Sequence, residues 1–389
     1  MDASRDGNTG FFSIAFNLPL LDNKRHQWVD YLRGVAIILI VYRHVLIGIQ
    51  RGNIVVPEVL VDANMVFYSF RMPLFFILSG IFISRSLEKY SIKQLVFKKF
   101  DLLFYPYLVW ASLQITLQIV MSDVTNSARS WIDYTYLFTQ PRELDQFWYL
   151  PALFNATVIY IFLKAKLKLH LALQLLLGIL LYFISSSFDM LSMISDWMAF
   201  YIFFVTGDLI ASKIFLPSTK KFLKSYWTLI LIIPVFVAVQ HYYLQQDFGN
   251  FALTAQSDAL KPSYFTHLRG QAEFLLIALF GAFCMFVLAF RLQDWKILKF
   301  LRIVGYHSLS IYVMHVIVTA SVRLSLIIIF GIRDPFVLLF TSIAMGIIIP
   351  ILFYNLLIKN GPAWFLFSFS RDHEKTTYKK EVKTSLNSR

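Results

Sequence analysis

Long apolar stretches separated by short polar connections run along almost the whole chain. Ten of these stretches are long enough to cross the hydrocarbon core of a bilayer, which requires about 20 helical residues. The pattern therefore predicts an all-α, polytopic integral membrane protein with ten transmembrane helices. The predicted spans lie near residues 33–50, 64–84, 103–121, 146–163, 168–187, 193–212, 225–243, 268–290, 307–329 and 335–358.

A single membrane domain fills most of the chain, and we see no internal repeat and no second soluble domain. We divide the sequence into a cytoplasmic N-terminal segment of residues 1–32, a transmembrane domain of residues 33–360 and a short cytoplasmic tail of residues 361–389. The end of the tail is charged and poor in apolar residues, which is typical of disordered segments. We expect that part to be disordered.

The charge distribution indicates the topology. The net charge of +13 alone would be compatible with a nucleic-acid partner. However, 26 of the 36 Lys and Arg residues lie on one side of the predicted spans, in alternate connections and at both ends, whereas 5 lie on the opposite side. The positive-inside rule places the basic side in the cytoplasm, and with it both termini. We therefore expect a lipid bilayer, and no nucleic acid, as partner.

The first span carries two ionisable residues in a region where each costs at least about 2.5 kcal/mol to insert. Arg33 lies at its cytoplasmic mouth, and His44 follows eleven residues later. At about 100° per residue the two return to within about 20° of the same helix face, about 16 Å apart along the axis. We expect both side chains to face one interior cavity. The alternative is a histidine satisfied by a neighbouring helix and an arginine that only fixes topology.

The ninth span carries a second polar face. Ser308, Tyr312 and His315 are spaced by four and three residues, so they share one side of the helix. The predicted depth of His315 is close to that of His44. If the first and ninth spans pack together, these side chains line one pocket near the middle of the bilayer. The alternative is interhelical hydrogen bonding, which we favour for Ser308.

Three further polar or aromatic residues are candidates near the outer surface. Arg71 in the second span precedes a proline, so we expect a buried cation in a kinked helix that either faces an incoming acceptor or pairs with Glu273. Glu273 follows Arg269 by four residues, which favours a salt bridge within the eighth span. Trp148 opens the fourth span and is expected first as an interface anchor and second as a cavity-lining residue.

Four segments together resemble the acyltransferase-3 family of membrane-embedded O-acyltransferases, in particular its fucose-4-O-acetylase-like and polysaccharide O-acetyltransferase-like branch. They are DYLRGVAIILIVYRH, RMPLFFILSGIFISRSL, FWYLPALF and SLSIYVMH, in the family's order and on the predicted spans. The resemblance covers nearly the whole chain. It implies transfer of an acyl group, usually acetyl, from cytoplasmic acyl-CoA to a carbohydrate or lipid-linked glycan acceptor at the cell membrane.

The resemblance also implies roles for individual residues. By position, His44 matches the family's catalytic histidine and Arg33 its essential arginine. Family members often carry an Arg-x-x-Arg pair ahead of the third span that helps to hold the coenzyme. Here Lys98 and Lys99 keep the positive charge without the bidentate fork of arginine, and Asp101 adds an opposing charge. The implied donor is acetyl-CoA or another acyl-CoA, and no metal is expected.

The mechanistic hypothesis places the phosphates of the coenzyme on Arg33 and the neighbouring lysines. A neutral His44 then acts as general base on the acceptor hydroxyl, or accepts the acyl group itself. Tyr312 or His315 stabilises the oxyanion or orients His44. Two other classes stay open, a glycolipid transporter or flippase, and a sensor or scaffold without activity. Transport is disfavoured because paired broken helices in two matching halves are absent from the pattern.

Overall fold

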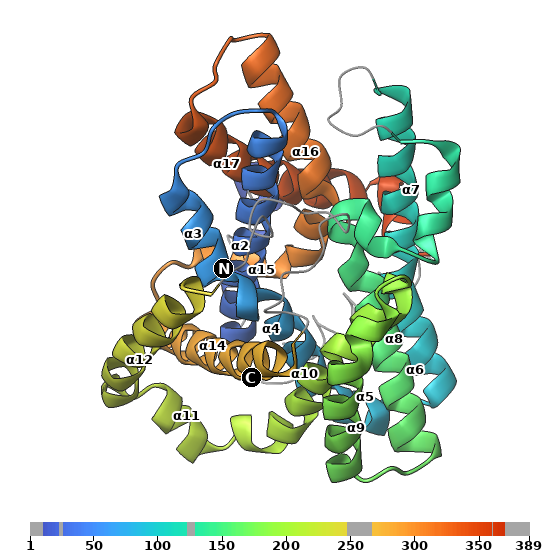
Figure 1. Cartoon of the computed structure of the whole chain (residues 1–389), viewed down its shortest axis with the longest axis vertical. Coiled ribbons are helices and arrows are strands. Elements are labelled where there is room, and N and C mark those ends of the chain that lie inside the picture. Colours follow the sequence, from blue (N-terminus) through green and yellow to red (C-terminus); the bar gives the residue numbers. More distant parts are fainter. Residues whose placement is uncertain (1–10, 23–25, 123–128, 247–266, 360, 370–389) are drawn as a thin grey trace, which may run out of the picture.

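The computed structural model describes residues 11–22, 26–122, 129–246, 267–359 and 361–369. Within these ranges the chain is helical and contains no strand, as Figure 1 shows. The all-α class is therefore confirmed. The predicted disordered end of the tail, residues 371–389, and residues 1–10 lie outside the described residues. The cytoplasmic placement of both termini stays a prediction.

Among the described residues, ten helical segments have the length and composition needed to cross a membrane, in agreement with the predicted number of spans. These are Gln27–Arg51, Glu58–Lys89, Ile92–Val120, Pro141–Lys166, Leu171–Phe188, Ser192–Ile214, Tyr226–Leu244, Leu268–Trp295, Ser308–Ile328 and Pro335–Ile358. The short helices between the spans or at their ends are α1 (Phe11–Ala15), η1 (Leu18–Asp22), η3 (Trp131–Leu137), η4 (Pro141–Trp148), η5 (Phe162–Lys166), η6 (Ser185–Phe188), α11 (Pro217–Leu223), η8 (Tyr354–Ile358) and η9 (Pro362–Leu366).

The second and third spans extend well beyond the predicted boundaries, because polar helical turns continue each apolar stretch. The second consists of α3 (Glu58–Val66), α4 (Tyr68–Ile81) and α5 (Ile83–Lys89), with short breaks at Phe67 and Phe82. The third begins with α6 (Ile92–Lys99), where Ser91 forms a capping box with Gln94. It continues through the π-helical η2 (Phe100–Phe104) into α7 (Tyr105–Val120). Hydropathy alone does not detect such polar extensions.

Helix α2 (Gln27–Arg51) lies at the centre of one group of helices (Figure 1). It is surrounded by other helices, so apolar residues on several of its faces, such as Ile37, Val41 and Leu46, have no exposed surface. The helices in contact with it include α14 (Leu268–Trp295), α15 (Phe300–Tyr306), α16 (Ser308–Ile328) and α17 (Pro335–Phe353). This central position fixes the orientation of Arg33 and His44.

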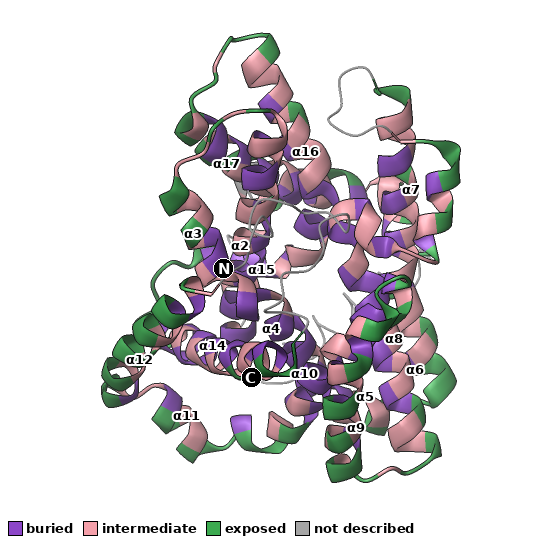
Figure 2. Cartoon of the chain, in the orientation of Figure 1, coloured by how far each residue is buried: buried purple, intermediate pink, exposed green. Residues whose placement is uncertain are grey.

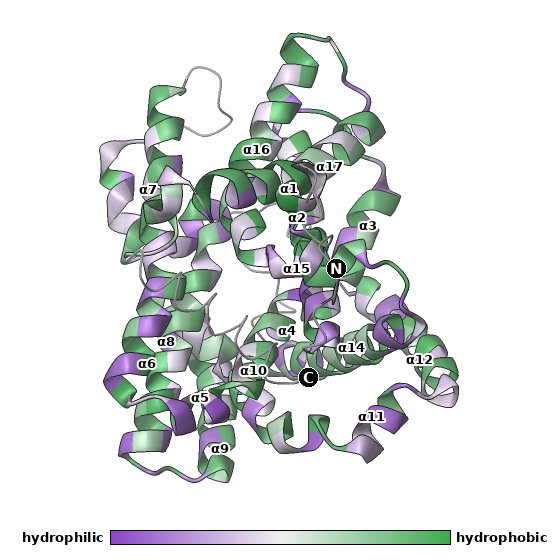
Figure 3. Ribbon diagram, turned by 180° about the vertical axis from the view of Figure 1, so that it is seen from behind, coloured by the Kyte–Doolittle hydropathy of each residue, from purple (hydrophilic) through white to green (hydrophobic). Residues whose placement is uncertain are grey.

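A second group of helices packs against α4 through α10 (Ser192–Ile214), which also contacts α8 (Tyr149–Ile161) and α9 (Leu171–Ile184). Burial decreases toward the periphery, where α9 and α12 (Tyr226–Leu244) expose much of their surface (Figure 2). That exposed surface is largely apolar, as in Leu176 and Leu231 (Figure 3). An apolar exterior of this kind is suited to lipid contact.

Two glycines allow α2 and α15 to touch through their backbones. A Cβ atom on Gly34 would collide with the carbonyl oxygen of Leu301, and one on Gly305 would collide with the carbonyl oxygen of Asp30. Small residues at such crossings are the usual means of close helix approach in membranes. Because Gly34 follows Arg33 directly, this contact also holds the arginine in place.

We predict that Gly305→Val separates α2 from α15 and destabilises the protein by about 1–3 kcal/mol, since the added carbons meet backbone that cannot move aside. Thermal unfolding of the purified protein in detergent measures the effect as a lower melting temperature. Ala238→Val, on the exposed surface of α12, is the matched control and is expected to melt like the wild type. Equal melting temperatures for the wild type and Gly305→Val would contradict the close contact.

Candidate active site

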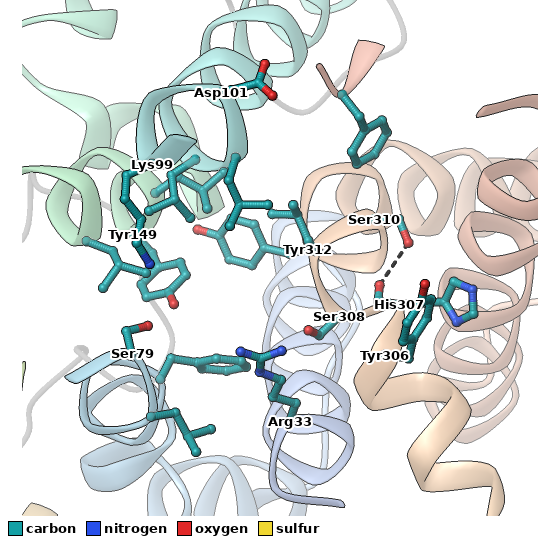
Figure 4. A pocket seen from close by; sticks show the side chains of 18 of the residues that line it. Arg33, Ser79, Lys99, Asp101, Tyr149, Tyr306, His307, Ser308, Ser310 and Tyr312 are labelled. Atoms are coloured by element: carbon teal, nitrogen blue, oxygen red, sulfur yellow. Dashed lines mark hydrogen bonds between the residues drawn. The ribbon is translucent and has the colours of Figure 1, made fainter. Parts of the chain in front are cut away.

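A cavity of about 580 Å³ lies between α2, α4, α8, α16 and the segment that joins α6 to α7. We call it the inner cavity. Its lining brings together Arg33, Lys98 and Lys99, the three cations that the resemblance assigned to the coenzyme (Figure 4 labels Arg33 and Lys99). Hydroxyl groups of Ser79, Tyr149, Ser308 and Tyr312 also line it. The combination of cations and hydroxyls suits a phosphorylated, partly polar ligand.

Asp101 also lines the inner cavity, where the segment after η9 engages its carboxylate. Its carboxylate accepts hydrogen bonds from the Ser368 hydroxyl at 2.9 Å and from the Phe369 amide at 2.6 Å. In Figure 4 its side chain lies far from Arg33. The opposing charge expected from the sequence is therefore present at the inner cavity, whose lining contains three cations and this one carboxylate.

A second cavity of about 320 Å³ is lined by His44 and lies between α2, α7, η4 and α16. We call it the outer cavity. Its polar lining residues are His44, Arg51, Gln114, Gln118, Asp145, Thr319, Ser321 and Arg323. Arg51 and Asp145 form a salt bridge of 3.0 Å there. Sequence analysis missed all of these residues except His44.

The expectation that Arg33 and His44 face one shared cavity is wrong for this structure. Arg33 lines the inner cavity and His44 the outer cavity, and neither appears in the lining of the other. Near the boundary, the Tyr312 hydroxyl donates a hydrogen bond to the carbonyl oxygen of Gln146, and the Tyr149 ring packs 5.4 Å from the Tyr312 ring. Helix spacing predicted the shared face but contained no information on which side chains fill the space along it.

The first and ninth spans pack together, the condition for a shared polar pocket, and they bring two histidines side by side. The rings of His44 and His315 are 5.1 Å apart, edge to face. His315 Nδ1 lies 2.8 Å from the carbonyl oxygen of Tyr312 and 3.0 Å from that of Ile311. Because both neighbours only accept, Nδ1 carries the proton of the neutral ring. His315 Nε2 is then a buried lone pair without a hydrogen-bond partner among the described residues.

These hydrogen bonds change the roles open to Tyr312 and His315. The single proton of Tyr312 is engaged with Gln146, and neutral His315 has no proton to offer at Nε2. Neither residue is a donor for an oxyanion in this arrangement. His315 is instead placed to accept a proton or a hydrogen bond beside His44.

The positive field around His44 comes from arginines. The charged side chains that act on it include Arg43, Arg51 and Arg71. Arg71 is 2% exposed, as predicted for a buried cation, and donates to Asn64 Oδ1 at 2.9 Å. Arg43 has a buried Nη1 atom without a hydrogen-bond partner among the described residues. Such cations stabilise negative charge that develops near His44.

Glu273 and Trp148 are not brought to either cavity. Glu273 accepts a hydrogen bond of 2.8 Å from Arg269, which confirms the expected pair within one helix and excludes it as the partner of Arg71. Trp148 packs against Phe200 and lies 4.6 Å from the guanidinium carbon of Arg142. Both residues stabilise the structure away from the cavities.

The missed residue Arg323 had a signal in the sequence. Thr319 and Arg323 continue the face of Tyr312 and His315 at intervals of four residues. Asp145 had none, because it lies in η4 at a non-helical position with φ 57° and ψ −108°. Periodicity does not report on such a segment.

Comparison with known proteins identifies the family. A family model described as an acyltransferase domain matches residues 26–355, most of the chain. The chain belongs to the acyltransferase-3 family. No curated protein and no solved structure matches it. The matched region of this acyltransferase-3 protein contains Arg33, Lys98, Lys99, His44 and His315. The protein is thus a membrane acyltransferase, and its ten spans make it a multi-pass integral membrane protein.

The two cavities predict opposite accessibility to a membrane-impermeant thiol reagent. In a Cys284→Ser background, which removes the single cysteine, a cysteine at Ser308 lines the inner cavity and one at Ala320 the outer cavity. We expect Ser308→Cys to react only from the side of the membrane that carries Lys98 and Lys99, and Ala320→Cys only from the other side. Labelling of inside-out and right-side-out vesicles measures this. Reaction of both cysteines from one side would contradict the separation.

Proposed function

We propose that the protein transfers an acyl group, acetyl in the first instance, from cytoplasmic acyl-CoA to a hydroxyl of a cell-surface or lipid-linked carbohydrate. The cell's cytoplasmic membrane is the proposed location, with the inner cavity toward the cytoplasm. The observation that carries the proposal is the placement of three cations in one cavity and of His44 in another. One of these cations, Arg33, lies on the same face of α2 as His44. A donor and an acceptor that approach from opposite sides require such an arrangement.

The donor fits the inner cavity by size and charge. About 580 Å³ lies within the range of about 300–1,000 Å³ that is common for small-molecule sites. Arg33, Lys98 and Lys99 would bind the phosphates of acyl-CoA, and Lys98 is already held 3.4 Å from the centre of the Tyr90 ring. The uncharged arm of the coenzyme then extends along α2 toward His44, about 16 Å from Arg33.

Chemistry at His44 begins with removal of a proton from the acceptor hydroxyl. The hydroxyl oxygen attacks the thioester carbonyl, and the resulting tetrahedral intermediate collapses with cleavage of the carbon–sulfur bond. The coenzyme leaves as a thiolate and takes the proton from His44, so charge and protons balance. Low dielectric favours the neutral imidazole that the first step needs. Acyl transfer through His44 itself is the alternative route.

His315 is proposed as the positioning residue of this step. Its Nε2 lone pair is available on the ring that packs edge to face with His44. An N–H of His44 directed at that lone pair fixes the base nitrogen toward the acceptor and stabilises the imidazolium as it forms. The oxyanion of the intermediate is stabilised by the field of Arg43 and Arg71 rather than by Tyr312.

Tyr312 has a different proposed role, as part of the boundary that the donor must cross. Its hydroxyl bond to Gln146 and its contact with Tyr149 lie where the inner cavity ends. The thioester reaches His44 once the Tyr312 side chain turns away. Closure in the absence of donor keeps the two sides of the membrane separate.

A transporter or flippase is the competing function, because two cavities on one pathway also suit alternating access. Transport needs no coenzyme, so specific binding of acetyl-CoA at the inner cavity distinguishes the classes. The family membership of the chain favours the acyltransferase.

We predict that His44→Ala abolishes acyl transfer from labelled acetyl-CoA, because the acceptor hydroxyl loses its base, with a loss of at least about 100-fold. Melting temperature in detergent is expected to stay near the wild-type value. His241→Ala, an exposed histidine, is the matched control and keeps activity. Retained turnover in His44→Ala would remove His44 from the mechanism. Labelled acyl-protein formed without acceptor and lost in His44→Ala would establish the acyl-histidine route instead.

For the donor site, Arg33→Ala is expected to raise the KM for acetyl-CoA by about 10-fold or more, because a charged hydrogen bond contributes about 1.5–3 kcal/mol. Arg33→Lys keeps the charge but not the fork, so its effect is smaller. Steady-state kinetics and equilibrium binding of acetyl-CoA measure both. Arg333→Ala, an exposed connection residue, is the control. An unchanged KM in both Arg33 variants would contradict the docking role.

A further inference from the structure

We propose that the outer cavity binds an anionic group of the acceptor, a carboxylate or a phosphate, on the guanidinium of Arg323. The acceptor is then an acidic carbohydrate rather than a neutral one. This inference rests on the proposed acyl transfer and specifies the substrate class of the same site. It follows from four features of the cavity that are independent of the family assignment.

The first feature is a buried cation aimed at the cavity. Arg323 lies in α16 two helical turns beyond His315, is 9% exposed and lines the same cavity as His44. Among the described residues it has neither an ion pair nor a hydrogen bond. An arginine that only anchors the helix would extend its guanidinium to the headgroups and be exposed there. Arg323 instead keeps its guanidinium inside the protein.

The second feature is the room that α2 makes for this guanidinium. A Cβ atom on Gly48 would collide with Nη1 of Arg323. Any side chain at position 48 would therefore push the guanidinium out of the place where it now lies. Gly48 lies one helical turn beyond His44, about 6 Å along the axis of α2, so the guanidinium and the imidazole lie at neighbouring turns of the same helix and line the same cavity.

The third feature is the charge balance of the lining. Arg51 and Asp145 neutralise each other through their salt bridge. Arg323 is then the remaining formal charge of the lining, since a neutral His44 contributes none. An unpaired cation in a low-dielectric site is costly, and an anion that forms two parallel hydrogen bonds with the guanidinium relieves that cost. The cavity with its ligand would be close to neutral.

The fourth feature is the absence of aromatic rings from the described lining, apart from the imidazole of His44. Neutral sugars are commonly held by stacking on aromatic side chains, and this chain is 17% aromatic. Beside several apolar side chains, the lining has the side-chain amides of Gln114 and Gln118, whereas the hydroxyls of Thr319 and Ser321 donate to carbonyl oxygens of their own helix. Without a ring for stacking, the guanidinium is the strongest recognition group of this cavity, and it selects an anionic sugar over a neutral one.

The test compares three acceptor probes that share the 2-, 3- and 4-hydroxyls and differ in the group at carbon 6: methyl glucoside, methyl glucuronide and methyl glucoside 6-phosphate. Acetyl transfer to each is measured with the full-length protein in detergent and with labelled acetyl-CoA. The wild type is expected to prefer at least one anionic probe over the neutral one by about 10- to 100-fold in kcat/KM. Arg323→Gln is expected to lose that preference, and Arg323→Lys to keep part of it.

A second measurement does not depend on turnover. Binding of each probe is followed as the shift in melting temperature of the purified protein. In the wild type, at least one of the two anionic probes is expected to raise the melting temperature. The probe with the larger shift shows whether the site binds a carboxylate or a phosphate. The shift is expected to vanish in Arg323→Gln and in Gly48→Val, which displaces the guanidinium, and to persist in Arg333→Gln, an exposed arginine.

The outcomes separate this inference from the proposed function. Acetyl transfer without a preference for an anionic probe, or with a preference that survives in Arg323→Gln, would overturn the inference and leave the transferase intact. An Arg323-dependent shift in melting temperature without any acetyl transfer would support the anion site and count against the transferase. No transfer and no shift with either anionic probe would count against both.

Discussion

The cost of placing ionisable side chains in hydrocarbon is the constraint on which this structure depends. Buried carboxylates are paired with partly exposed cations, as in Asp196 with Arg142 at 2.6 Å and Asp208 with Lys164 at 2.5 Å. Arg43, Arg71 and Arg323 have no such partner among the described residues. Because two of these arginines act on His44 and the third shares its cavity, the surroundings of His44 are cationic. A site of this kind favours negatively charged intermediates and ligands.

Helix α2 determines where three of the ionisable side chains lie. It is enclosed by other helices, it touches α15 at Gly34, and it carries Arg33, His44 and Arg51 along one face. Tyr312, which binds Gln146, lines the inner cavity, and His44 lines the outer cavity. In the proposed mechanism, these residues attract the coenzyme on one side, supply the general base in the middle and recognise the acceptor on the other side.

Features that depend on hydropathy or helix periodicity could be predicted from the sequence, whereas features that depend on individual hydrogen bonds could not. Ten spans follow from hydropathy, and the meeting of His44 with His315 follows from helix faces and depth. The division into two cavities could not be predicted from the sequence, because it depends on the hydrogen bond between the Tyr312 hydroxyl and the backbone carbonyl of Gln146. Both the carbonyl of Gln146 and the side chain of Asp145 belong to η4, whose local backbone departs from helical geometry and leaves no periodic pattern. The roles of Tyr312 and His315 likewise depended on which atoms their protons reach.

The central claim is that the donor enters the inner cavity and its thioester reaches His44. An experimental structure of the protein with a non-hydrolysable acetyl-CoA analogue tests it most directly. The account predicts phosphates beside Arg33, Lys98 and Lys99, the Tyr312 hydroxyl released from Gln146, and the acyl carbonyl next to His44. An analogue bound outside the inner cavity, or one whose acyl group ends below an intact contact between Tyr312 and Gln146, would contradict the account.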